Sequence, residues 1–349
     1  MRMVLSVVIA AGLLAAPAVQ QWEGQRSGTD ARLRGISAVS SRVAWASGAR
    51  GTVLRTVDGG RVWQALTVPG AGALDFRDID AMSDRVAYVL SIGNGPASRI
   101  YKTEDSGAIW TLQFQNEDPK AFFDAMAFWD EQRGIAFSDS VDGRFVILRT
   151  LDGGRSWTPI PAASLPPALD NEGAFAASGT NVTMSGRQHV WIATGAAVTS
   201  RVLYSSDAGN TWAVANTPLA TGSAAGAFSI AFRDTRHGLI VGGDYNKEDD
   251  ATNNAAMTSD GGRTWKPVTG LTGYRSVVAH LPGGRGGSRP WLAVGPNGAD
   301  LSLDDGKTWS QISSLGFDTV AVAKPADGEP ATIFGAGANG RLGRLQLKR

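Results

Sequence analysis

The stretch that decides the fold is TLDGGRSW at residues 150–157, because close copies of it recur along the chain. The shared pattern is Ser/Thr-x-Asp-x-Gly-x-x-Trp, and the other copies are TVDGGRVW (56–63), TEDSGAIW (103–110), SSDAGNTW (205–212), TSDGGRTW (258–265) and SLDDGKTW (302–309). Successive copies lie 47, 47, 55, 53 and 44 residues apart. Repeats of this length are typical of four-stranded propeller blades, so the sequence predicts a protein built of β-blades.

Each copy is predicted to form a tight turn between the third and fourth strands of its blade. The aspartate carboxylate can accept backbone N–H groups inside such a turn, the glycine allows a positive φ, and the tryptophan fills space between blades. A structural rather than a catalytic role is therefore assigned to the six repeated aspartates: Asp58, Asp105, Asp152, Asp207, Asp260 and Asp304.

Seven blades are expected rather than six, because strand-like stretches also stand before the first copy and after the last one. These are WASGARGTVLRT (45–56) and IFGAGANGRLGRL (333–345). The C-terminal stretch supplies three strands, so the segment around residues 19–22 is expected to add the fourth and close the ring, which removes exposed sheet edges. The predicted fold class is all-β, a seven-bladed β-propeller of four-stranded antiparallel blades, with residues 19–349 as one domain.

Composition argues against several classes of protein. The 349 residues carry a net charge of +1, with 33 Lys and Arg against 32 Asp and Glu, which argues against nucleic-acid binding. Cysteine is absent, so disulfides, thiol nucleophiles and thiolate metal sites are excluded. The three histidines, His189, His237 and His280, lack metal-ligand spacing. No cofactor and no metal are expected, and a closed ring is compatible with a monomer.

The first 18 residues, MRMVLSVVIAAGLLAAPA, have the organisation of an export signal. Arg2 precedes an apolar stretch at residues 3–16, and Ala16-Pro17-Ala18 matches a small-residue cleavage site. The apolar stretch is short for a bilayer-spanning helix, and no later stretch is long and apolar enough. We therefore expect cleavage after residue 18, no transmembrane segment after cleavage, and a protein that acts in the periplasm or outside the cell.

Binding residues are expected on the face opposite the aspartate turns, around the central channel, by analogy with other propellers. The residue after the first large apolar residue of each blade should ring the channel mouth. Read around the seven blades, these residues are Arg34, Arg77, Asp124, Ala176, Ser229, Arg275 and Asp318. Three arginines and two aspartates at one mouth predict a pocket for a carboxylate or phosphate. The alternative is a ring of ion pairs that only holds the blades together.

Polar loops add further candidates on the same face. They are SDSVDG (138–143), GGDYNKEDDATNNAA (242–256) and the blade crossing LPPALDNEGAF (165–175). Long loops on a rigid scaffold often carry binding residues. From these loops we select as ligand or partner contacts Asp139, Asp142, Glu172, Asp244, Tyr245 and Lys247. The acidic loop lacks the EF-hand glycine and terminal glutamate, so a solvated loop is favoured over a Ca²⁺ site.

Beyond the repeats, the chain after residue 18 resembles the exported Asp-box (BNR) propellers called photosystem II stability/assembly factor-like proteins. The resemblance includes RGISAVSSRVAWASGARGTVLRTVDGG (34–60) and FFDAMAFWDEQRGIAFSDSVDGRFVILRTLDGG (122–154). It implies an assembly scaffold that binds a protein on an arginine-lined face, with Arg34, Arg77 and Arg275 as counterparts. The leading interpretation is therefore a non-catalytic scaffold that binds a protein or an acidic ligand, such as a small molecule or glycan.

Enzymatic alternatives remain open. A sialidase-like glycoside hydrolase or lyase acting on an acidic sugar would use Tyr245 with Glu172 as nucleophile pair and Asp124 as acid. Asp124 and Asp139 are the carboxyl pair to compare with the separation that such enzymes need, about 5–9 Å. The Arg-Ile-Pro signature of sialidases is missing, and their blade number differs from seven. An oxidoreductase, as some relatives are labelled, is the least favoured class because no cofactor motif is present.

Overall fold

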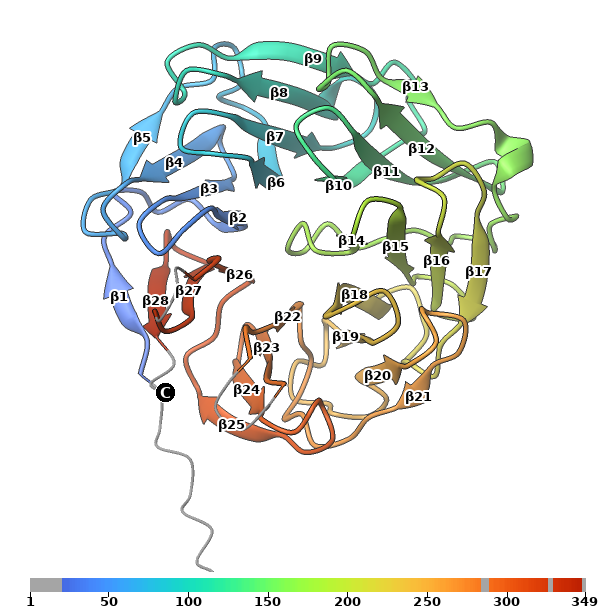
Figure 1. Cartoon of the computed structure of the whole chain (residues 1–349). Coiled ribbons are helices and arrows are strands. Elements are labelled where there is room, and N and C mark those ends of the chain that lie inside the picture. The colour runs from blue at the N-terminus through green and yellow to red at the C-terminus, as the bar shows by residue number, and fades with distance from the viewer. Residues whose placement is uncertain (1–20, 284–288, 326–328, 347–349) are drawn as a thin grey trace, which may run out of the picture.

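The computed structural model describes residues 21–283, 289–325 and 329–346, which form a ring of seven four-stranded antiparallel sheets. Figure 1 shows the ring face-on, with the first strand of each blade nearest the centre. The predicted fold class, an all-β propeller with seven blades, is confirmed. The export signal predicted at residues 1–18 lies outside the described residues. Within those residues, no helix is long and apolar enough to cross a membrane.

The first three blades follow one another along the chain. Blade 1 consists of β2 (Leu33–Ala38), β3 (Ala44–Gly48), β4 (Thr52–Thr56) and β5 (Gln64–Leu66). Blade 2 consists of β6 (Asp75–Ala81), β7 (Ala87–Ile92), β8 (Arg99–Thr103) and β9 (Thr111–Gln115). Blade 3 consists of β10 (Phe123–Phe128), β11 (Gly134–Val141), β12 (Arg144–Thr150) and β13 (Thr158–Pro159).

Blades 4 to 6 continue in the same order. Blade 4 consists of β14 (Val182–Ser185), β15 (His189–Thr194), β16 (Arg201–Ser205) and β17 (Ala213–Asn216). Blade 5 consists of β18 (Ala225–Phe232), β19 (Gly238–Asp244), β20 (Ala255–Thr258) and β21 (Lys266–Pro267). Blade 6 consists of β22 (Val277–His280), β23 (Trp291–Gly295), β24 (Gly298–Ser302) and β25 (Ser310–Ser313). The described residues also contain two short 3-10 helices, η1 (Gly95–Ala97) and η2 (Ala162–Ser164).

Blade 7 joins the two ends of the chain. Its inner strands are β26 (Thr319–Val322), β27 (Thr332–Ala336) and β28 (Leu342–Gln346). The outer strand is β1 (Glu23–Gln25), which pairs antiparallel with β28. An N-terminal strand therefore closes the ring as predicted, although it begins just after the expected residues 19–22. Trp22 instead packs on Phe317, with ring centroids 4.4 Å apart.

Apolar packing between blades makes the ring a continuous scaffold. Each boundary between neighbouring blades holds its own cluster of buried apolar side chains. At the boundary between blades 5 and 6, for example, Leu239 and Val241 belong to one cluster with Val278 and Trp291. Because the burial of apolar surface is the main stabilising term in folding, these clusters hold the blades in fixed positions. The loops at the channel mouth therefore start from rigid strand ends.

The six repeated aspartates share one hydrogen-bond pattern in their turns. In each turn, the Oδ1 atom accepts the backbone N–H of the residue four positions later. The Ser or Thr two positions earlier donates its hydroxyl to the same oxygen. That hydroxyl in turn accepts the N–H of the repeated glycine. The aspartates are thus bonded within their own turns.

Substitution of Asp260 with alanine tests this pattern. Its carboxylate accepts hydrogen bonds from the backbone N–H and the hydroxyl of Thr264, at 3.0 and 2.6 Å. We expect the variant to lose about 2 kcal/mol of unfolding free energy at pH 7, measured by urea denaturation. Thr264→Val removes only the hydroxyl bond and should cost less than half as much. An Asp260→Ala variant as stable as the wild type would contradict the structural role.

The pH dependence of the difference in unfolding free energy between the wild type and Asp260→Ala provides a second measurement. Partial burial raises the pKa of Asp260, but hydrogen bonds from Thr264 and Thr258 outweigh it and hold the pKa at about 2. A carboxyl group with a lowered pKa stabilises the fold above its unfolded-state pKa, and this contribution is lost as pH falls through the folded value. The difference between wild type and Asp260→Ala should therefore shrink between about pH 4 and pH 2.

Residues 175–181, called here the central plug, cross the channel before blade 4 begins. The sequence predicted that an inner strand follows Phe175, but β14 starts only at Val182. The plug instead projects toward the centre of the ring (Figure 1). Its run of small residues, Ala-Ala-Ser-Gly, suits this narrow space, and most of it is buried.

Hydrogen bonds tie the central plug to blades on several sides. The Ser178 hydroxyl donates to the carbonyl of Ser276 in blade 6 at 2.8 Å. The Thr319 hydroxyl of blade 7 donates to the Ser178 carbonyl at 3.0 Å. The carbonyl of Thr180 accepts the backbone N–H of Ile230 in blade 5 at 3.0 Å. The plug therefore fills the channel and gives the mouth a floor.

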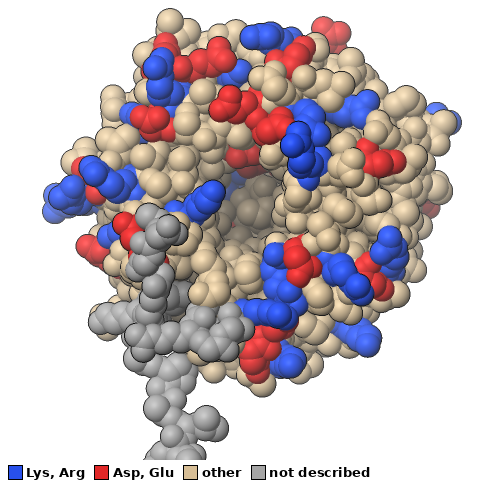
Figure 2. Space-filling view, viewed as in Figure 1, with Lys and Arg blue, Asp and Glu red and all other residues tan. Residues whose placement is uncertain are grey.

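Charged side chains of both signs are interspersed on the face shown in Figure 2, around a central hollow. This mixture agrees with a net charge of +1 over the whole sequence. A mixed surface produces a weak long-range field. Recognition of a charged ligand must therefore depend on local groups.

Candidate binding site

A cavity of about 550 Å³ occupies the channel mouth above the central plug. Blades 1, 2, 3, 5, 6 and 7 and the plug all contribute to its walls. The polar residues and aromatic residues that line it are Arg32, Arg34, Arg77, Asp124, Asp139, Glu248, Ser276, Asp318, Phe122, Phe175, Phe228, Tyr245 and Tyr274. A broader depression of about 910 Å³ beside β1 is more open, and it lacks an aromatic lining. The mouth is therefore the candidate site.

Bulges in the inner strands aim three of the predicted side chains into the mouth. In β2, β6 and β10 the register with the next strand slips at one residue each, namely Arg34, Arg77 and Asp124. A bulged residue is left out of the ladder, and its side chain is redirected. In blade 5 the slip falls at Phe228, so this ring lines the cavity. Ser229, which the sequence analysis placed at the mouth, is fully buried and does not line it.

Two of the mouth arginines are already paired with carboxylates. The guanidinium of Arg32 donates to both carboxylate oxygens of Asp318, each at 2.8 Å. Arg77 donates from Nε to Asp75 at 2.8 Å and from Nη1 to the Ala176 carbonyl of the plug at 3.2 Å. These bonds fix the positions of the two guanidinium groups. They also neutralise much of the charge of both arginines.

Arg34 differs from both neighbours because its side chain makes no hydrogen bond or ion pair within the described residues. It lies between the paired arginines Arg32 and Arg77, on the first inner strand β2. Burial, and repulsion by Arg77 and Arg32, lower the pKa of Arg34 to about 10. The guanidinium is still charged at neutral pH. The mouth therefore contains a partly buried cation that no carboxylate bonds directly, although Asp318 and Asp75 act on it electrostatically.

Asp124 and Asp139 form a carboxyl pair on the other side of Arg77. Both side chains line the cavity and their carboxyl groups interact electrostatically, and Oδ1 of Asp139 accepts the backbone N–H of Ala174 at 2.9 Å. Burial raises the pKa of Asp124 well above its usual value, and the charge of Asp139 raises it further. Burial also raises the pKa of Asp139, to about 6. Buried carboxyl groups that interact share a proton, so the pair carries at most one negative charge near neutral pH.

Aromatic side chains form the opposite wall of the mouth. Phe175 of the plug stacks on Phe228, with ring centroids 3.9 Å apart. The ring of Tyr245 stands edge-on to both, at 6.2 and 6.1 Å, and Tyr274 contacts Phe228 edge-on at 4.8 Å. Tyr245 remains 46% exposed. The wall offers an apolar surface for a ligand side chain next to the charged residues.

The structure does not bring Arg275 to the mouth, which corrects the sequence analysis. Its side chain is completely buried and forms an ion pair with Asp300 of β24 at 2.7 Å. It also donates to Asn297 at 2.8 Å. The inner strand β22 has no register slip and begins only at Val277, so no bulge directs Arg275 into the channel. The lone aspartate in the apolar strand β24 was the signal of a buried cationic partner.

Glu172 is likewise a structural residue rather than a mouth residue. Its side chain is fully buried and is ion-paired with Arg201 of blade 4. The Thr194 hydroxyl donates to Oε1 at 2.7 Å, and the backbone N–H of Leu169 donates to Oε2 at 2.8 Å. Both carboxylate oxygens are therefore occupied. Glu172 does not line the cavity with Tyr245, so the predicted nucleophile pair is not assembled.

The remaining loop candidates divide between the mouth and the surface. Asp142 is exposed and pairs with Lys120 at 2.8 Å, and Asp244 lies 3.7 Å from Lys247. Asp142, Asp244 and Lys247 do not line the cavity, whereas Tyr245 does. The structure thus brings together six of the predicted binding residues: Arg34, Arg77, Asp124, Asp139, Tyr245 and Asp318.

Sequence reasoning missed several mouth residues. Arg32 stands immediately before β2 and two positions before Arg34, and the alternation of side chains along an extended segment could have indicated it. Glu248 belongs to the loop that was selected for Asp244, Tyr245 and Lys247. Phe175, Phe228 and Tyr274 were recognised only as blade starts. No group of three or more His, Asp or Glu side chains in the described part of the chain is arranged to hold a metal ion.

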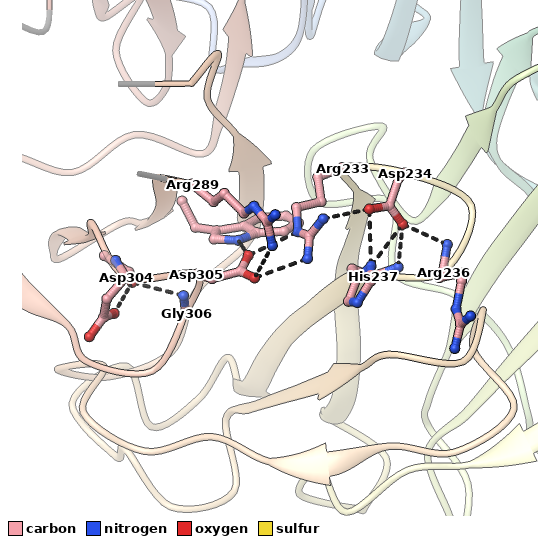
Figure 3. Close-up of polar contacts among 10 residues, drawn as sticks. Arg233, Asp234, Arg236, His237, Arg289, Asp304, Asp305 and Gly306 are labelled. Atoms are coloured by element: carbon pink, nitrogen blue, oxygen red, sulfur yellow. Dashed lines mark hydrogen bonds and ion pairs between the residues drawn. The ribbon is translucent and has the colours of Figure 1, made fainter. Parts of the chain in front are cut away.

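A second polar cluster lies between blades 5 and 6 (Figure 3). Arg233 donates from Nε and Nη2 to the two carboxylate oxygens of Asp305, both at 3.0 Å. The indole N–H of Trp291 donates to the same carboxylate at 3.2 Å. Asp234 accepts the backbone N–H of His237 at 2.8 Å. Both carboxylates are already bonded within the chain, so this cluster joins two blades, and a smaller cavity of about 190 Å³ lies against His237 and Asp305.

Comparisons with known proteins give similarity in structure but not in sequence. No protein-family model and no curated protein sequence matches the chain. A solved structure of YCF48 bound to D1 peptide superposes with a TM-score of 0.64 at 17% identity, covering 95% of this chain and 99% of that chain. YCF48 from Cyanidioschyzon merolae gives a TM-score of 0.62 at 17% identity, covering 93% and 98%. The WD40 propeller domain of Doa1 gives 0.61 at 12% identity, covering 95% and 98%. At these identities, the similarity establishes the propeller fold alone.

Proposed function

We propose that the protein is a non-catalytic binding scaffold that holds an acidic segment of a protein partner in the propeller mouth. The observation that carries this proposal is Arg34, a partly buried guanidinium that forms no hydrogen bond or ion pair with the described chain. An unpaired buried charge is costly, and a ligand carboxylate supplies the missing counter-charge through two parallel N–H bonds. The neighbouring arginines Arg32 and Arg77 add positive charge beside Arg34, which increases the attraction for a ligand carboxylate.

The shape of the mouth favours a peptide segment as the ligand. A concave cavity of about 550 Å³ has room for a few side chains. Beside Arg34, the wall of Phe175, Phe228, Tyr245 and Tyr274 can take an apolar side chain of the same segment. A peptide is also what the YCF48 structure contains in its complex. That parallel supports a protein partner but does not identify it.

Export belongs to the same proposal. Residues 1–18 have the sequence of an export signal, and we propose that they are removed to leave residues 19–349 as one propeller domain outside the cytoplasm. The partner would then be a protein that is exposed outside the cytoplasm. Detection of the N-terminus of the secreted protein by mass spectrometry tests this part. A retained residue 1 would contradict it.

The geometry gives the glycoside hydrolase alternative no support. Glu172 is bound to Arg201, away from Tyr245. Asp124 and Asp139 interact as one acidic pair on the same wall of the mouth, whereas the two carboxyl groups of such enzymes stand about 5–9 Å apart, on either side of the sugar bond. The carboxyl pair is therefore not arranged on the two sides of a glycosidic linkage.

An array of paired synthetic peptides tests the proposed function. Each acidic peptide is matched with a counterpart in which every Asp and Glu is replaced by Asn and Gln. We expect the wild type to bind acidic peptides and to lose affinity for the amide counterparts. The Arg34→Ala variant should bind the best acidic peptide about 10- to 100-fold more weakly, since a charge-assisted hydrogen bond is removed.

Arg50→Ala is the matched control for this experiment. Arg50 is an exposed arginine that pairs with Asp30 at the surface and does not line the mouth. Its replacement removes the same charge and should leave peptide affinity unchanged. Equal binding of acidic and amide peptides would overturn the proposal, as would an Arg34→Ala variant that binds as tightly as the wild type.

A further inference from the structure

We propose that the mouth takes up its acidic ligand together with a proton on the Asp124–Asp139 pair, so that binding strengthens as the pH falls. This inference rests on the proposed function and adds a regulation to the same site. It starts from two interacting carboxyl groups that line the same cavity as Arg34, one of them fully buried. Like charges that interact in a buried site cannot both be ionised at low cost, so this pair must gain or lose a proton as conditions change.

The surroundings of Asp124 favour a protonated carboxyl group in the pair. Its side chain is 1% exposed, and its Oδ2 atom receives no hydrogen bond from any described group. A buried carboxylate oxygen without a donor is costly, and a proton on one member of the pair removes that cost. Asp139 is the more accessible member, and it is fixed by the backbone N–H of Ala174.

The other charged groups around the pair already form hydrogen bonds or ion pairs within the protein. From β6, Arg77 is bonded to Asp75, and Asp78 accepts the backbone N–H of Met126 at 2.7 Å. From the crossing before the plug, Glu172 is bonded to Arg201. The plug itself contains no charged residue.

Two further acidic groups lie around the site, and burial raises the pKa of one of them, Asp80, to about 6, the same range as that of Asp139. Asp80, on the same strand as Asp78, accepts the backbone N–H of Phe128 and does not line the mouth. On the far side of the cavity, Glu248 is another acidic side chain that faces the mouth.

The sign of the pH effect follows from the charge of the pair. Above pH 6 the pair carries a negative charge, because the pKa of Asp139 is raised by burial to about 6. That charge repels an incoming carboxylate and attracts Arg77. Below pH 6 the pair is neutral, so the unpaired charge of Arg34 dominates its surroundings. Ligand carboxylates remain ionised in this range because their usual pKa lies near 4.

The test is a titration of the best acidic peptide from the array at several pH values, monitored by fluorescence anisotropy. For the wild type we expect the dissociation constant to fall about tenfold between pH 7.5 and pH 5.5, as expected for the loss of one nearby charge. Asp139→Asn, which has nearly the same shape, should bind tightly at both pH values. Asp84→Asn is the control, because Asp84 is an exposed carboxylate outside the mouth. It should follow the wild type.

Proton uptake by the wild type gives a measurement that needs no variant. Calorimetric titrations in two buffers with different ionisation enthalpies report the protons bound per peptide. We expect uptake near pH 6.5 and none at pH 8.5. The absence of uptake, or full pH dependence in Asp139→Asn, would overturn this inference while leaving the proposed function intact. A wild type that binds no acidic peptide at any pH would overturn both.

Discussion

Replacement of Arg275 with alanine is expected to lower the free energy of unfolding by about 3–5 kcal/mol, because it leaves a buried carboxylate without its cation. Both Arg275 and Asp300 are fully buried, 2.7 Å apart. Thr272 also donates its hydroxyl at 3.0 Å and its backbone N–H at 3.1 Å to Asp300, but two neutral donors do not replace the cation. Urea denaturation at pH 7 measures the loss.

Two further variants separate this effect from a general loss of charge. Lys120→Ala breaks the exposed pair with Asp142, and surface pairs of this kind are worth less than about 1 kcal/mol. The double variant Arg275→Met, Asp300→Leu removes both buried charges and should recover much of the stability lost by Arg275→Ala. If the free energy of unfolding of the Arg275→Ala variant lies within about 1 kcal/mol of the wild-type value, the ion pair is not needed for stability.

Gly179→Ala is expected to destabilise the protein by about 3 kcal/mol, because the plug has no space for a side chain at this position. The residue has a φ of +69°, and an added Cβ would lie 2.4 Å from Oδ1 of Asp78. Asp78 cannot move away freely, since it is buried and accepts the backbone N–H of Met126. Thermal and urea denaturation both report the change.

Gly28→Ala is the matched control for the plug variant. Gly28 has a similar φ of +75°, but an added Cβ would meet no atom within 4 Å. Its replacement should cost only the conformational strain of a positive φ, about 1 kcal/mol. Equal losses of unfolding free energy in Gly179→Ala and Gly28→Ala would contradict a tightly packed central plug.

The fold could be predicted from the sequence because six of the seven blades carry the same turn motif. The Ser/Thr, Asp and Gly of TLDGGRSW form hydrogen bonds within eight residues, so the motif needs no distant partner. The number of blades then follows from the period of the repeat. Ring closure follows from the missing fourth strand of the C-terminal blade. The one misplaced element is the start of blade 4, where the plug replaces the expected strand.

The site was harder to predict because it depends on whether the inner strand of each blade contains a one-residue bulge. Arg34 and Arg77 fall at bulges, so a rule based on the preceding apolar residue finds them. Blade 6 lacks a bulge, and the same rule wrongly selects Arg275. Nothing in the local sequence of Glu172 indicates Arg201, which lies on the next blade. Ion pairs between distant residues decide which charged groups remain open to a ligand.

The most direct test of the central claim is to locate a bound acidic peptide by photo-crosslinking. A benzoylphenylalanine replaces Tyr245 at the mouth in one variant, and Leu151 on an aspartate turn at the opposite face in another. Both positions are exposed, by 46% and 61%. The mouth site predicts crosslinks from position 245 that excess unlabelled peptide suppresses, and none from position 151. Crosslinks from position 151 alone, or equal crosslinks from both, would contradict it.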